Sequence, residues 1–240
     1  MALGLVAATL VGCGGGSNGF IDAYTGAYEG IFLGSNGAPG AVAFVVAPNG
    51  QIVSGTATTN ASGTQSSLSG SVSNSGSATI NIVNGGAVTD TLVGNLTAPT
   101  PNTVGAALTD TGGHSYGALI FNPTKFTGND QFAGEFVGTI TDVNKARIGV
   151  LALAVTGGGN VDGTALVDEN GTSELAVLNG SISNNGTTSL VVAVNGTTIE
   201  TITGTLSLAM VSSVQTISGN LKDSSSGDTI MIDATLALQP

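Results

Sequence analysis

Short runs of alternating apolar and polar residues, each ended by a tight-turn sequence, limit the fold of this chain more than any other feature. Alternation is clear in Ala78-Thr79-Ile80-Asn81-Ile82, for example. A period of two places the apolar side chains of a β-strand on one face. Many turns are marked by Asn-Gly pairs, which tolerate the positive φ that hairpins demand. These pairs begin at Asn49, Asn84, Asn170, Asn185 and Asn195.

The composition points away from helices. Charged residues make up 8% of the chain, whereas a typical soluble domain carries about 25%. Long soluble helices need Glu, Lys, Arg and Gln on their solvent face, and no helical period with such residues follows residue 20. We therefore expect an all-β protein with almost no helix.

The sequence also matches itself at an offset near 110, which predicts an internal repeat. Gly26 to Ile31 aligns with Gly134 to Thr139, and Gly70 to Gly76 aligns with Gly180 to Gly186. The matches keep their order along the chain. We expect one β domain over 25–122, a linker over 123–131 and a second β domain over 132–240.

Each copy contains about eight runs of strand character. In the first copy we expect strands near 26–34, 41–47, 51–57, 66–73, 77–83, 88–97, 102–109 and 115–121. In the second copy the corresponding strands fall near 134–141, 148–156, 160–167, 174–183, 187–194, 197–208, 213–222 and 228–237. The connections are too short for crossover helices, so neighbouring strands should be antiparallel.

Glycines in the middle of these strands predict strong coiling of each sheet. They are Gly30, Gly55, Gly70, Gly94 and Gly105, with partners Gly138, Gly163, Gly180, Gly204 and Gly219. We therefore expect two tandem meander β-barrels of about eight strands each, and a two-sheet β-sandwich per copy remains the alternative. In architecture alone this resembles small up-and-down barrels such as those of streptavidin-like and lipocalin-like proteins.

The N-terminal segment has the features of an export signal. Residues 2 to 12 are apolar, too few to span a bilayer but long enough for a signal-peptide core. The sole cysteine, Cys13, follows, and a Gly-rich stretch over 14–19 comes after it. The run Leu10-Val11-Gly12-Cys13 resembles the lipobox of bacterial lipoproteins.

That resemblance implies a signal peptide over 1–12, acylation of Cys13 by chains such as palmitate, and a lipid anchor with a flexible tether over 13–24. It places the protein in the bacterial cell envelope, at the outer membrane or cell surface, with the membrane as a partner through Cys13. Signal peptides normally begin with Lys or Arg, and residues 1 to 3 have neither, which leaves open a start upstream of Met1.

The charge balance excludes one class of partner. Four basic residues face fifteen acidic ones, so the net charge is −11. Affinity for phosphate backbones comes from clustered Lys and Arg. We therefore expect no nucleic-acid partner.

No candidate catalytic or metal-binding constellation is visible in the sequence. The lone histidine, His114, lies in a Gly-rich turn beside Ser115, and a triad is assembled from separated parts of a fold. The acids near 168–169 together with Glu174 lack the spacing of a calcium loop and read as a solvated turn. We expect no enzymatic activity, no cofactor and no metal.

These observations favour a lipid-anchored, non-enzymatic binding or structural module. One alternative is a barrel that binds a small apolar ligand in an interior lined by Ala43, Val45, Ala152 and Ala154. Another is a surface adhesin that binds glycans through Ser- and Thr-rich strands. The sequence leaves the ligand and the oligomeric state open.

Overall fold

A computed structural model describes residues 24–33, 39–58, 65–97, 103–112, 115–121, 130–169 and 172–238. Their regular structure is almost entirely β, as the sequence predicts. Cys13, His114, the Asn170-Gly171 turn and most of the expected linker lie outside these residues. Among the described residues, no helix is long and apolar enough to cross a membrane.

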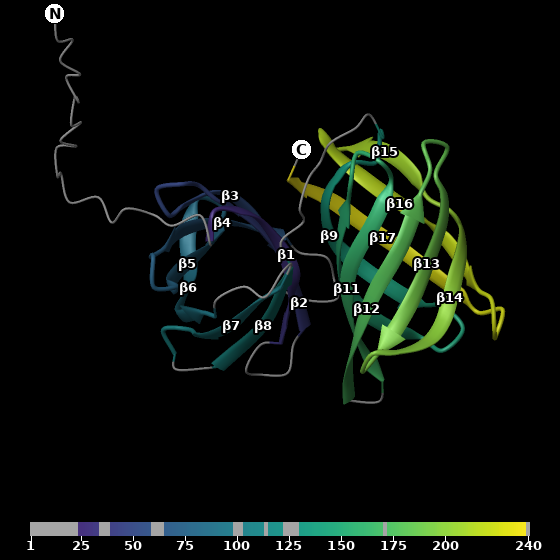
Figure 1. Ribbon diagram of the computed structural model, residues 1–240, viewed down its shortest axis with the longest axis horizontal. Coiled ribbons are helices and arrows are strands. Elements are labelled where there is room, and N and C mark those ends of the chain that lie inside the picture. The colour runs from purple at the N-terminus through teal and green to yellow at the C-terminus, as the bar shows by residue number, and fades with distance from the viewer. Residues whose placement is uncertain are drawn as a thin grey trace, which may run out of the picture.

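The first sheet is a closed barrel of eight described strands in the order β1 to β8, with β8 hydrogen-bonded back to β1. All its neighbouring pairs are antiparallel, and Figure 1 shows the barrel from one end. The strands are β1 (Gly26–Leu33), β2 (Pro39–Val46), β3 (Gln51–Thr58), β4 (Gln65–Val72), β5 (Ser77–Asn84), β6 (Ala87–Leu96), β7 (Thr103–Thr109) and β8 (Ser115–Phe121).

The second sheet has nine described strands in the order β14-β13-β12-β11-β10-β9-β17-β16-β15. It curls until β14 also pairs with β16, so its two sides meet. We call it the second barrel. The strands are β9 (Gly134–Asp142), β10 (Arg147–Val155), β11 (Asn160–Glu169), β12 (Thr172–Ile182), β13 (Thr187–Val194), β14 (Thr197–Thr205), β15 (Ser207–Val211), β16 (Val214–Asp223) and β17 (Thr229–Leu238).

Barrels, rather than sandwiches, therefore form, and the predicted strands fall close to the observed ones. One predicted strand, 197–208, is divided into β14 and β15 at Leu206. The Leu206 side chain is buried, and its backbone N–H leaves the ladder to donate to the Gly186 carbonyl at 2.9 Å. Beyond this point β15 pairs with β16 alone.

One end of each barrel is held by an equivalent set of contacts. In the first barrel the Leu96 N–H donates to the Gly76 carbonyl at 2.8 Å, as Leu206 does to Gly186 in the second. An aromatic residue just ahead of each barrel packs on this turn: Tyr24 lies against Gly76 and Phe132 against Gly186. Both rings are buried, so each barrel is closed at this end by side chains.

Alternation along the strands divides the buried residues into inner and outer sets. The inner face of the first barrel holds a cluster that includes stacked Tyr28 and Phe44, whose ring centroids lie 5.4 Å apart. The inner face of the second holds Phe136, Leu153 and Leu178. Each barrel therefore has its own apolar core.

A third apolar cluster joins the barrels through their outer faces. The outer sides of β1 and β2 pack against β9, β10, β11 and β17. Figure 1 shows β1 and β2 on the side of the first barrel that faces β9 and β11. The shared cluster contains Ile31, Ala41, Ala43, Val137, Val150, Ala152 and Leu166, with Ala27, Val45 and Ala237 packed against it.

This contact corrects one prediction. Ala43, Val45 and Ala152, expected to line barrel interiors, lie on the outer faces within the contact between the barrels. Ala154 is buried on the same side of β10 as Ala152. The reason is that β2 and β10 are apolar on both faces, so alternation alone does not say which face is internal.

Mid-strand glycines allow the close strand approach that curling requires. A Cβ on Gly180 in β12 would lie 2.0 Å from the carbonyl oxygen of Ser189 in β13. Gly70 in β4 has the same relation to Thr79 in β5. No side chain fits at such a distance without moving backbone.

Gly180→Ala should therefore lower the free energy of unfolding by about 1–3 kcal/mol, because the backbone must shift to admit the methyl group. The matched control is Ser181→Ala on the next, exposed residue of β12, which should change stability by less than about 0.5 kcal/mol. Urea denaturation followed by circular dichroism measures both. Equal stability of the two variants would contradict the packing role of Gly180.

Candidate functional site

The candidate site is a cavity at one end of the second barrel. Its walls come from strands β9 to β14 and β17. The volume of the cavity is about 110 Å³. Its lining residues are Ile140, Asp142, Lys145, Arg147, Ala165, Val167, Glu174, Ala176, Leu178, Val192, Val194, Ile199, Glu200 and Ile230.

Two facing alanines account for part of the hollow. Ala165 in β11 and Ala176 in β12 are direct partners in the strand register, and both point inward. The two methyl groups lie side by side and leave space between them and the opposite wall. One step further along β12, the larger side chain of Leu178 fills the interior. The cavity thus lies between these alanines and the open end of the barrel.

The first barrel carries a larger side chain at the position that corresponds to Ile140. At an offset of 108, Phe32 in β1 aligns with Ile140 in β9. The Phe32 ring packs over Gly40, where a Cβ would come within 2.1 Å of the ring. A phenylalanine therefore occupies, in the first barrel, space that isoleucine leaves open in the second.

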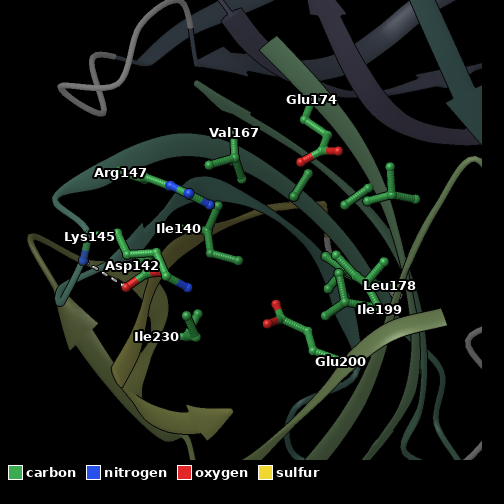
Figure 2. Close-up of a pocket in the computed structure, with 14 residues that line it drawn as sticks. Ile140, Asp142, Lys145, Arg147, Val167, Glu174, Leu178, Ile199, Glu200 and Ile230 are labelled. Carbon is green, nitrogen blue, oxygen red and sulfur yellow. Dashed lines mark hydrogen bonds and ion pairs between the residues drawn. The ribbon is translucent and has the colours of Figure 1, made fainter. Parts of the chain in front are cut away.

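Charged side chains gather at the mouth of the cavity because the β9–β10, β11–β12, β13–β14 and β16–β17 connections all lie at this end. Figure 2 shows Arg147, Glu174 and Glu200 extending from β10, β12 and β14 toward the middle of the pocket. Two of the chain's four basic residues, Lys145 and Arg147, are among the lining residues.

The β9–β10 turn is held by Asp142. One oxygen of its carboxylate accepts the backbone N–H groups of Asn144 and Lys145, both at 3.1 Å. The other pairs with the Lys145 ammonium at 3.2 Å. Lys145 also pairs with Asp228 at 2.8 Å, so it links the β9–β10 turn to the adjacent β16–β17 turn at the rim of the barrel. These pairs raise the pKa of Lys145 and lower that of Asp228.

The surroundings of Glu200 and Asp223 shift their pKa values in opposite directions. Partial burial, reinforced by the nearby negative charge of Asp223, raises the pKa of Glu200. Hydrogen bonds from Ser226 and Ser225 in the following turn lower the pKa of Asp223. The surroundings therefore favour the protonated form of Glu200 and the ionised form of Asp223.

The site combines an apolar interior with a charged mouth. Its walls are apolar, and its polar groups are carboxylates, an ammonium and a guanidinium. Among the residues that the structure describes, no group of three or more His, Cys, Asp and Glu side chains is placed to hold a metal ion.

The sequence anticipated little of this site. Glu174, interpreted as part of a solvated turn, is exposed at the mouth of the cavity. No sequence pattern marks Lys145, Arg147 and Glu200 as neighbours, because their strands come together only when the sheet curls. The available signal was Asp142-Val143-Asn144-Lys145, a polar turn that carries a base between two apolar strands.

Comparison of the chain with protein-family models, with curated proteins and with solved structures finds no match.

Proposed function

We propose that the protein is a non-enzymatic binding module of the bacterial cell envelope, and that its second barrel holds a small ligand at the open end. The observation that carries this proposal is the cavity itself. It has apolar walls and a charged mouth, at one end of a barrel whose other end is closed by Phe132. An apolar pocket with a few convergent polar groups is the usual form of a small-molecule site.

The size of the cavity limits what enters it. A cavity of about 150 Å³ in a protein core admits a molecule as small as benzene, whereas drug-sized ligands need at least about 300 Å³. At about 110 Å³, this cavity takes one small apolar group. The rest of the ligand then lies among the charged residues at the mouth.

The charges at the mouth restrict the other end of the ligand. Lining acids Asp142, Glu174 and Glu200 outnumber the bases Lys145 and Arg147. Lys145 is already paired with two carboxylates. The ligand is therefore a small amphiphile whose apolar end enters the cavity and whose polar end is uncharged or cationic.

Attachment to the membrane through Cys13 completes the proposal and rests on the sequence. The Leu10-Val11-Gly12-Cys13 run and the Gly-rich stretch that follows support it. Each buried CH₂ of an acyl chain contributes about 0.8 kcal/mol, and more than one chain gives stable anchoring. No basic surface is needed for this mode of attachment.

Ala176→Leu should weaken ligand binding at least tenfold, because the added carbons occupy the hollow beside Ala165. The probes are straight-chain 1-alkanols and alkylamines of increasing length, titrated calorimetrically into the full chain carrying Cys13→Ser. Affinity for the unaltered barrel should rise with chain length and then level off once the cavity is full.

The matched control is Ala209→Leu, the same substitution at an exposed position of β15 outside the cavity. It should leave the affinity unchanged. Equal affinities of the two variants, or no binding of any alcohol or amine, would contradict the proposed site.

The mature protein from its own host should begin at Cys13 and carry a diacylglyceryl group. Intact-mass and peptide mass spectrometry of the membrane fraction measure both features. Cys13→Ser should release the protein from the membrane. Recovery of a protein that retains residues 1–12 with an unmodified thiol would contradict the anchor.

A further inference from the structure

Two carboxyl groups are sealed inside the contact between the barrels. Glu29 in β1 and Glu135 in β9 are both 0% exposed. Neither oxygen of either carboxyl group has a hydrogen-bond partner. A buried charge normally requires an ion pair or hydrogen bonds, so this arrangement calls for an explanation.

Both groups lie where they are because of strand alternation. Glu29 follows inward-facing Tyr28, and Glu135 precedes inward-facing Phe136, so both glutamates face outward. In the strand register Glu29 lies beside Ala43, and Glu135 lies beside Ala154. The outer faces that meet here are mostly apolar, with the buried hydroxyl groups of Thr58 and Thr164 among them.

No base among the described strands compensates the pair. Of the strands that meet in this contact, β1, β2, β3, β9, β10, β11 and β17, only β10 carries a basic residue, Arg147. Arg147 is seven residues from Ala154 along β10, which is roughly 23 Å at the rise of a β-strand. The guanidinium therefore lies at the opposite end of the contact.

The other titratable groups of these strands are exposed acids, or they lie on the inner face or at the far end of the contact. Asp162 in β11 is the register partner of Ala154, and Asp233 lies in β17; both are exposed. Tyr28 faces the interior of the first barrel, and β2 and β3 carry no titratable side chain. Asp142 is the register partner of Arg147, at the far end of β9.

These surroundings favour the protonated form of both carboxyl groups. Burial raises the pKa of Glu135 to about 8. Burial, with the negative charges of Glu135 and Asp162, raises the pKa of Glu29 well above its ordinary value. A neutral carboxyl group costs far less to bury than a carboxylate.

We propose that the contact between the two barrels is a proton-dependent hinge, closed while Glu29 and Glu135 carry protons and opened when they lose them. Each barrel keeps its own core in both states, and the chain between β8 and β9 holds them together. Opening exposes the outer apolar faces, including Ile31, Val150 and Ala152. Because β10 and β11 also wall the cavity, the hinge adjoins the proposed ligand site without depending on it.

The direction of the pH dependence follows from proton linkage. When the barrels separate, water surrounds both carboxyl groups and their pKa returns to near the ordinary 4.5. The closed state therefore binds more protons than the open state. Its stability is complete below about pH 4.5 and is lost as the pH rises through about 8. Each carboxyl group that titrates makes closure about tenfold less favourable per pH unit.

A buried thiol reports on this opening. Cys13→Ser removes the sole cysteine, and Ala152→Cys then places a reporter inside the contact, where Ala152 is fully buried. Its rate of labelling by a maleimide is measured from pH 5 to pH 9. The control is Met210→Cys, which places a thiol at a position that is 68% exposed. Dividing each labelling rate by the rate of this control corrects for the ionisation of the thiol as the pH rises.

The corrected labelling rate should rise about tenfold or more per pH unit between pH 6 and pH 8. The double variant Glu29→Gln, Glu135→Gln should remain protected across this range, and each single variant should show a weaker dependence on pH than the unaltered pair. The control variant Asp233→Asn removes an exposed carboxyl group on a neighbouring strand. Its labelling rate should depend on pH as strongly as it does with Glu29 and Glu135 unaltered. A rate that does not depend on pH, or one with the same slope in the glutamine variants, would overturn the hinge.

Discussion

The need to cover apolar sheet faces without helices governs this structure. Each sheet curls, so its inner face becomes its own core, and this leaves the outer face to be covered by something else. Over most of the surface that face is polar and meets water. Along β1, β2, β9, β10 and β11 it is apolar, and the two barrels cover each other there. The contact between barrels is therefore built into the strands themselves.

The same scaffold is filled differently in its two copies. The first barrel stacks Tyr28 on Phe44 and sets Phe32 near its open end. The second has Ile140 in place of Phe32, and its cavity is also lined by the facing Ala165 and Ala176. Closure of the sheet is common to both, but a cavity arises where the inward residues are too small to meet. The clearest difference between the two interiors is therefore the Phe32 ring, which Ile140 replaces in the second barrel.

The fold could be predicted from the sequence because its signals are local. Alternation predicted the strands, Asn-Gly pairs predicted the hairpins, and mid-strand glycines predicted the coiling of the sheets. The position of the inner face was less certain where both faces are apolar, as in Arg147-Ile148-Gly149-Val150-Leu151-Ala152-Leu153-Ala154-Val155. Such a run indicates burial on both sides, and it was the available signal for the contact between barrels. Glu29 gave no comparable signal, since an outward glutamate ordinarily meets water.

The barrels meet over two buried carboxyl groups, which we infer to be neutral. Infrared spectroscopy of the intact chain at pH 7 tests this inference most directly, because protonated and ionised carboxyl groups absorb at different frequencies. The account predicts a carbonyl band of protonated carboxylic acid that disappears when Glu29 and Glu135 are both replaced by glutamine. A spectrum at pH 7 with ionised carboxylates alone would contradict it.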